Sequence, residues 1–192
     1  MSPINSKNKG NRNELKICEA FNKRFNTTEF QRCPQSGAWG TRLNKKLSVG
    51  AQEQLSGDAM VPSNFAFSLE CKAGYNIEIS RLIDLKSNPD KKKIYEFLSQ
   101  SSNDARKVSG RKPCVIYRRD RHDPLVFIPK FEVMNYEITH LSFTYEEEET
   151  WKKWIMISFD DFLNPEYFPD EFFIISDKEE EKQKDPENNN TR

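Results

Sequence analysis

The chain has 192 residues, of which 31% are charged and 35% are hydrophobic, and its formal net charge at pH 7 is zero. The length suits one domain of ordinary size with terminal extensions, and no apolar run approaches the roughly 20 residues that span a bilayer, so no membrane-spanning helix is expected. The four cysteines lie far apart and neither His122 nor His140 has an evident partner, which argues against a zinc site, a disulfide framework and histidine-centred nucleophilic catalysis.

The N-terminal part of the chain predicts a polar segment followed by a helix. Residues 1–10 are polar and are expected to be flexible. From Asn11 to Phe25, apolar residues recur at helical spacing, beginning with Cys18. Glu14 precedes Cys18 by four residues, so its carboxylate lies on the same apolar stripe. A carboxylate that faces inward is costly unless it is paired, hydrogen-bonded or bound to a metal ion.

A hairpin is predicted after a short strand and a turn-rich loop in residues 29–43. A three-residue turn at 62–64 would join its two strands. The second strand alternates apolar residues with small and charged ones, so Glu70 and Lys72 share one face. Antiparallel pairing across this turn brings Asp58 to the same face, whereas a turn of two or four residues would place Asp58 on the opposite face. The sequence therefore favours two carboxylates and one ammonium group on one face of a hairpin.

The middle of the chain predicts one long helix and two further strands. A helical turn is expected near residues 78–85. The helix that follows has Pro89 in its first turn and ends before Gly110. Residues 112–120 and 124–130 flank a polar turn and are typical of an antiparallel pair of strands.

The C-terminal part divides into an aromatic segment and a charged tail. Residues 131–176 carry enough aromatic side chains to be ordered, although the order of helix and strand within them is open. Residues 177–192 are a low-complexity acidic tail and are expected to be disordered. Helix and strand alternate along the chain as a whole, which predicts an α/β domain built on a mixed sheet.

The chemistry of the predicted carboxylate face suits a hard metal ion. Mg²⁺ binds one or two carboxylates, keeps several waters and accepts phosphate oxygens, so Asp58 and Glu70 are candidate ligands. Beside a phosphodiester, such an ion stabilises negative charge and lowers the pKa of a bound water. Lys72 is placed to orient that water and to offset developing charge. Glu14 is a candidate to join this group from the N-terminal helix.

The charge is distributed unevenly along the chain. Residues 1–130 contain 24 basic and 13 acidic residues, a net charge of +11, and residues 131–192 carry the compensating −11. A basic surface attracts a phosphate backbone without reading its sequence, so the basic part favours nucleic acid as a partner. A lysine-rich solvated surface would show the same pattern.

These residues resemble the PD-(D/E)xK nuclease superfamily. Gly57-Asp58 followed by Glu70-Cys71-Lys72 is similar to its D-x(n)-E-x-K signature. KGNRNELKICEAF resembles the opening helix of archaeal and phage Holliday junction resolvases, whose glutamate falls on Glu14, and RCPQSGAWG is similar to the loop that follows it. FLSQSSNDARKVSGRKPCVIYRRD is similar to the helix and strand after the ExK motif in the phage members. The resemblance covers roughly residues 9–130.

The resemblance implies a restriction-endonuclease-like fold, a mixed β-sheet flanked by helices, in a nuclease domain of residues 11–176. Residues 11–130 would form its motif-bearing core and residues 131–176 a C-terminal extension. It also implies a homodimer that cleaves branched DNA by paired nicks with Mg²⁺, for which Mn²⁺ would substitute. Such a protein acts inside cells, in the cytoplasm, in DNA recombination and repair, and a phage origin fits.

The resemblance assigns roles to individual residues. Asp58, Glu70 and Glu14 would be catalytic metal ligands together with the backbone carbonyl of Cys71, and Lys72 would orient the attacking water. Residue 57 is glycine, where the superfamily signature has proline.

Further residues are implied at the DNA. Ser36 would lie close to the scissile phosphate, as both a catalytic and a DNA-contacting residue, and Arg32 would contact DNA. The remaining implied DNA contacts are Arg12, Lys45, Lys46 and Gln100.

Two other functions stay open. The superfamily reuses one metal site for many substrates, so a restriction or repair nuclease for linear or single-stranded DNA is an alternative. A non-catalytic DNA-binding protein of the same fold is the other.

Overall fold

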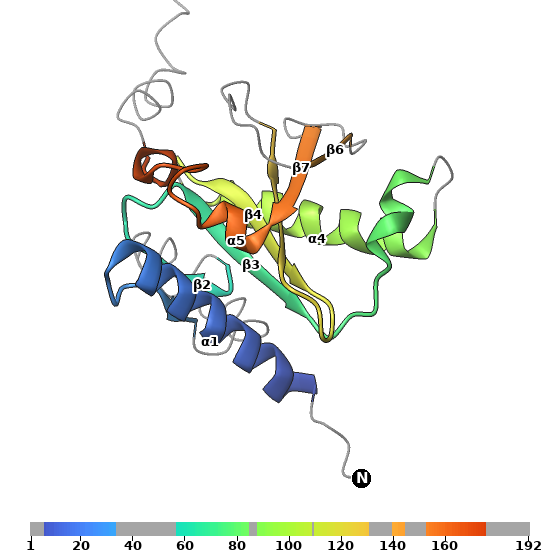
Figure 1. The fold of residues 1–192 in the computed structure, drawn as a ribbon, viewed down its shortest axis with the longest axis horizontal. Helices are drawn as coiled ribbons and strands as arrows, with labels where there is room; N and C mark the ends of the chain where they lie inside the picture. The colour runs from blue at the N-terminus through green and yellow to red at the C-terminus, as the bar shows by residue number, and fades with distance from the viewer. Residues whose placement is uncertain are drawn as a thin grey trace, which may run out of the picture.

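The computed structural model describes residues 6–33, 57–84, 88–108, 110–130, 140–144 and 153–175. These ranges contain a five-stranded sheet, a two-stranded sheet and the helices that cover them (Figure 1). The helices within them lack the continuous apolar length that a bilayer crossing requires.

The five-stranded sheet has the strand order β3-β4-β5-β7-β6. Its strands are β3 (Phe67–Ala73), β4 (Lys112–Arg118), β5 (Leu125–Pro129), β7 (Lys153–Ser158) and β6 (Leu141–Thr144). β3 and β4 run parallel, and the other neighbouring pairs are antiparallel. The predicted α/β class with a mixed sheet is therefore confirmed, as is the antiparallel pair β4–β5. β3 forms one edge of this sheet.

Both faces of the sheet are covered. Helix α1 (Ser6–Phe25) packs on the face of Phe67 and Leu69, and helix α4 (Pro89–Ala105) lies behind the opposite face (Figure 1). Because successive side chains of a strand point to opposite faces, β3 contributes to both layers. Its residues 67–71 are buried without a break, including the polar Ser68 and Glu70. The edge strand of the sheet is thus held between two helices.

Local signals explain why α4 forms where it was predicted. The side chain of Asn88 accepts a hydrogen bond of 2.9 Å from the backbone N–H of Lys91, which caps the helix, and Pro89 occupies its first turn. Its buried residues are Ile94, Phe97, Leu98, Ser101, Ser102 and Ala105. The helical turn expected before it is the 3₁₀ helix η1 (Ile79–Ile83).

Phenylalanines from both ends of the chain build the core on the α1 side. Phe21 is fully buried, and its ring centroid lies 5.1 Å from that of Phe30 and 6.3 Å from that of Phe162. Phe162 comes from the short helix α5 (Phe159–Phe162), and the 3₁₀ helix η2 (Asp170–Phe173) adds Phe173. Residues 153–175, whose elements the sequence left open, thus complete the sheet and this core.

Helix α1 begins earlier than expected. It starts at Ser6, so residues 6–10 are helical, whereas the sequence predicted a flexible segment up to residue 10. The polar composition of this first turn concealed the start because it lacks the apolar periodicity that marks the rest of the helix.

The predicted hairpin is wrong. Strand β2 (Ala59–Met60) pairs antiparallel with β1 (Gln31–Arg32), and β3 pairs with β4. Gly57 passes so close to β3 that the two segments exchange isolated contacts in place of a ladder. The alternating pattern of residues 65–72 correctly predicted a strand, but such a pattern does not indicate which other strand it pairs with.

The cysteines form no disulfide framework, as their spacing in the sequence predicted. All four are buried and free. Burial raises the pKa of Cys18 to about 11 and that of Cys33 to about 12. Thiols of this kind stay protonated at neutral pH and are poor nucleophiles and metal ligands.

Candidate functional site

Gly57 and Asp58 form the link that reaches the open edge of β3. Gly57 has a φ of +91°, and a Cβ at this position would stand 2.6 Å from the carbonyl oxygen of Leu69. Only glycine adopts this conformation readily and leaves room for such an approach. The backbone N–H of Asp58 then donates a 2.9 Å hydrogen bond to the Leu69 carbonyl. The glycine at residue 57 is therefore a structural requirement for the placement of Asp58.

The side chain of Asp58 is fixed against the same edge. Its Oδ2 accepts a hydrogen bond of 2.8 Å from the backbone N–H of Cys71. Its own carbonyl accepts one of 3.0 Å from the backbone N–H of Cys33. Because the N–H and C=O of one strand residue point to the same side, the carbonyl of Cys71 also faces this edge. A carboxylate and a backbone carbonyl therefore share the open side of β3.

Glu70, Lys72 and Gln100 form a hydrogen-bonded network on the face of β3 that α4 covers. Lys72 Nζ donates to Glu70 Oε1 and, at 3.1 Å, to Gln100 Oε1. Gln100 Nε2 donates to Glu70 Oε1 at 2.7 Å. The exposed fraction of the side chain is 4% for Glu70 and 14% for Lys72. Two donors therefore hold one oxygen of a nearly buried carboxylate.

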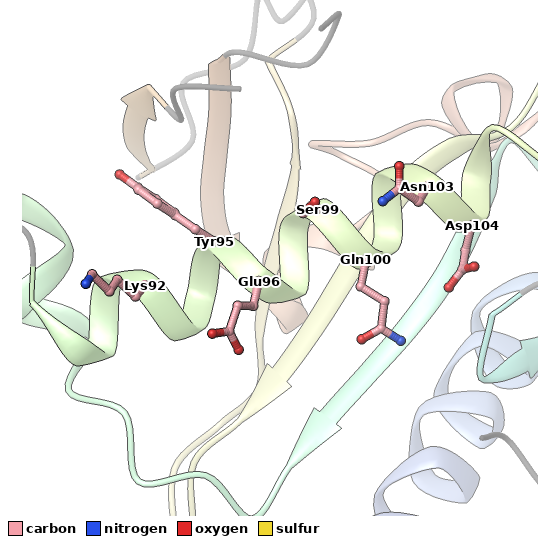
Figure 2. A pocket seen from close by; sticks show the side chains of 7 residues that line it. All are labelled: Lys92, Tyr95, Glu96, Ser99, Gln100, Asn103 and Asp104. Carbon is pink, nitrogen blue, oxygen red and sulfur yellow. The ribbon is translucent and has the colours of Figure 1, made fainter. Parts of the chain in front are cut away.

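The helix α4 aims Gln100 at this network. In Figure 2, Gln100 and Asp104 leave the helix on the side of β3, whereas Tyr95 points away from the strand. Gln100 also belongs to a shallow hollow along α4 that seven residues between Lys92 and Asp104 line. Gln100 therefore belongs both to this hollow and to the network with Glu70 and Lys72.

Glu14 reaches the site from α1. Its Oε2 accepts a hydrogen bond of 2.6 Å from Arg32 Nε, and an Arg32 Nη donates at 2.8 Å to Asn11 Oδ1. Glu14 is 7% exposed. The inward carboxylate that the sequence predicted is thus paired, and strand β1 supplies its partner.

The pKa shifts show that Asp58 lies within electrostatic range of both glutamates. Burial, and after it the negative charge of Asp58, raises the pKa of Glu70 to about 7. Burial raises the pKa of Glu14 as well, with Asp58 adding to the shift and Arg32 opposing it. Burial alone would lower the pKa of Lys72, but the adjacent Glu70 more than offsets this and the pKa is raised. The electrostatic influence of Asp58 therefore reaches Glu70 on the α4 side of the sheet and Glu14 on the α1 side.

The donor set suits a hard divalent cation. Carboxylate pKa values that are raised by a neighbouring carboxylate mark a place where a positive charge is favourable. Within the described ranges, no three His, Cys, Asp or Glu side chains form a group able to hold an ion. Mg²⁺ needs only one or two carboxylates because water and phosphate oxygens complete its shell. Asp58 and Glu70 meet that requirement, and Glu14 stands to one side with Arg32.

The other predicted site residues have different positions. Ser36, Lys45 and Lys46 lie outside the described residues. Arg12 is exposed on α1. Arg32, implied as a DNA contact, pairs with Glu14 and is 24% exposed in its side chain.

Two residues have contacts that the sequence analysis did not anticipate. Asn11 accepts a hydrogen bond from Arg32. Asn11 precedes Glu14 by three residues, which places both on one face of the helix, and this spacing could have indicated that they share a partner. Gln100 was implied as a DNA contact, but it contacts Glu70 and Lys72. Its position three residues after the buried Phe97 places it at the margin of the inward stripe of α4.

Comparison with known protein families identifies a match over most of the chain. The family model described as "Phage putative PDDEXK endonuclease" matches residues 5–170. No curated protein and no solved structure matches the chain.

Proposed function

Because the chain belongs to this family of phage PDDEXK endonucleases, we propose that it is a metal-dependent, structure-specific DNA endonuclease that resolves four-way junctions by paired phosphodiester hydrolysis. The observation that carries the proposal is the placement of Asp58 at the open edge of β3, beside the network of Glu70, Lys72 and Gln100. In metal-assisted hydrolysis of a phosphodiester, an acid pair can hold the metal ion and a protonated amine can offset the developing charge.

Asp58 and Glu70 would hold the metal ion, with the carbonyl of Cys71 available on the same edge. Bound Mg²⁺, or Mn²⁺ in its place, supplies an acidic water and positive charge for the phosphate. The backbone contacts of Asp58 keep its carboxylate in place before the ion arrives. This reduces the reorganisation that binding requires.

Lys72 acts as a cation in this proposal. Its raised pKa keeps the amine protonated at neutral pH, so it donates hydrogen bonds and does not abstract a proton. It would orient the attacking water and offset the charge that builds on the phosphate oxygens as the new P–O bond forms and the bond to the leaving sugar oxygen breaks. Gln100 keeps the amine next to Glu70 and is a positioning residue.

Glu14 would complete the site from the α1 side. Its carboxylate accepts from Arg32 through one oxygen. In the proposal, this carboxylate receives a hydrogen bond from water bound near Asp58, while Arg32 and Asn11 fix its orientation.

The choice of a four-way junction rests on the sequence resemblance of residues 9–130 to junction resolvases and on their net positive charge. Paired nicks on opposite strands require two sites, so the proposal includes a homodimer. Size-exclusion chromatography with light scattering tests that part, and a monomer at working concentration would contradict it.

A synthetic four-way junction tests the activity. We expect paired nicks with Mg²⁺ and none with EDTA. Asp58→Asn and Glu70→Gln should bind the junction without cutting it, whereas Glu19→Gln, which changes an exposed carboxylate of α1, should cut normally.

Three results would refute the proposal or part of it. Absence of cleavage by folded wild-type protein would refute the enzyme, and junction binding without any metal-dependent product would point to a non-catalytic DNA-binding protein. Preference for the junction over matched duplex below about tenfold, or ~1.4 kcal/mol, would favour a restriction or repair nuclease.

A further inference from the structure

One exposed aromatic ring stands next to the proposed catalytic amine. Tyr75 is 41% exposed, although large hydrophobic side chains with this much exposure are few among the described residues. It follows β3 directly, three residues after Lys72 and past the bend at Gly74. No role in hydrolysis explains why a tyrosine occupies this position.

The backbone of Tyr75 is held by a buried hydroxyl group. The Tyr117 hydroxyl donates a hydrogen bond of 2.9 Å to the carbonyl of Tyr75 and accepts one of 3.1 Å from the N–H of Ile77. Tyr117 itself is 1% exposed on β4. The exposed ring is therefore attached to a fixed backbone.

The ring of Tyr75 is also held from one side. Its centroid lies 4.9 Å from that of the buried Phe97 of α4, at an interplanar angle of 60°. Lys72 Nζ lies 5.4 Å from the centroid of the same Phe97 ring. Tyr75 and the proposed catalytic Lys72 thus both lie against the ring of Phe97.

A second amine, that of Lys93, lies over the ring of Tyr75. Lys93 Nζ is 5.6 Å from the centroid of Tyr75 and 5.5 Å from that of Phe97, and it also pairs with Glu96 at 2.6 Å. A rigid aromatic ring flanked by amines is the arrangement on which single-stranded nucleic acids stack their bases while the amines meet the phosphates.

We infer that Tyr75 is a stacking platform for one unpaired nucleobase of the DNA strand whose phosphate lies at Lys72. The inference rests on the proposed function and narrows its substrate to DNA with an unstacked base next to the cleavage point, as at a branch. In a continuous duplex each base is already stacked on both sides, so its faces are closed to the ring. Tyr75 would therefore select for interrupted stacking and not for base sequence.

Binding in EDTA tests the inference separately from cleavage. The probes are a duplex with one unpaired adenine and the same duplex without it, followed by fluorescence anisotropy. Wild-type protein should prefer the bulged probe. Tyr75→Leu should weaken binding to the bulged probe by about 5- to 100-fold and leave the paired probe unchanged, because stacking of a single base is lost. Tyr75→Trp should keep the preference.

Tyr95→Leu is the matched control. Tyr95 also lies near a lysine, with Lys91 Nζ 5.8 Å from its ring centroid, but it points away from β3 (Figure 2). This variant should keep the preference for the bulge.

A second measurement uses unaltered protein. A photoreactive 5-iodouracil at the unpaired position should crosslink to Tyr75, which mass spectrometry of the digested protein would identify. Crosslinking to another residue, equal binding of both probes by wild-type protein, or an equal effect of Tyr75→Leu on both probes would overturn the inference. Retained bulge preference without cleavage would instead refute only the proposed enzyme activity.

Discussion

The close approach of Gly57 to β3 makes a quantitative prediction about Gly57→Ala. An added Cβ would lie 2.6 Å from the carbonyl oxygen of Leu69, whereas real Cβ atoms keep at least 3.0 Å. The segment must therefore retreat by about 0.4 Å or more. This displacement lengthens the adjacent 2.9 Å hydrogen bond from Asp58 to Leu69 beyond the normal limit of about 3.2 Å.

The expected loss of stability combines two effects. A left-handed φ costs an alanine about 1–2 kcal/mol, and the lost hydrogen bond costs a further 0.5–1.5 kcal/mol or so. The free energy of unfolding of Gly57→Ala should therefore fall by roughly 1.5–3.5 kcal/mol. Because Asp58 moves with the segment, the proposed cleavage of the junction should slow by about tenfold or more.

Urea denaturation of Gly57→Ala and Gly74→Ala provides the assay. Gly74 has a similar φ of +86°, but nothing lies within 4 Å of its added Cβ, so Gly74→Ala reports the backbone cost alone. We expect Gly57→Ala to be less stable than Gly74→Ala by about 1 kcal/mol. Equal stability of the two variants, or full cleavage by folded Gly57→Ala, would refute the reasoning.

Three further predictions follow from the network and the core. Gln100→Leu should slow cleavage by about 10- to 100-fold because Glu70 and Lys72 lose their positioning residue, while Asn103→Leu on the outer side of α4 should not; equal rates for both variants would contradict this. The pKa of Glu70 is about 7 in the folded protein, against an ordinary 4.5, so folding favours the protonated carboxyl group. This contribution to the free energy of unfolding is complete below pH 4.5 and is lost as the pH rises through 7. Metal-free wild type should therefore lose up to roughly 3 kcal/mol across that window by urea denaturation, and Glu70→Gln should lack this slope. Phe21→Ala should cost about 3–5 kcal/mol of unfolding free energy, and a loss below about 1 kcal/mol would contradict the packing described for its ring.

Local patterns in the sequence predicted the elements that depend on local contacts. The helix of residues 89–105 carries its own cap and apolar stripe, and β4 and β5 are joined by a short turn. The pairing of β2 with β1, and of β3 with β4, joins segments that are distant in the chain. The periodicity of residues 57–72 does not indicate that β2 pairs with β1 or that β3 pairs with β4.

The candidate site was predicted in part, and for a reason that differs from the real one. Asp58 does lie within electrostatic range of Glu70, but it is held by the N–H of Cys71 and by the glycine conformation at residue 57, not by the register of a hairpin. The pairing of Glu14 with Arg32 depends on where β1 crosses α1, which a single sequence does not specify.

The order in which the chain is synthesised has a consequence for when the site can form. The described acids and the amine of the candidate site all precede residue 73. The core that packs against α1, however, includes Phe162 and Phe173, and the sheet is completed by β7, which lies between β5 and β6. A ribosome therefore synthesises the candidate site residues well before it synthesises the segment whose side chains pack against α1. A nascent or prematurely terminated chain would carry every charged group of the candidate site and still lack the core that positions them.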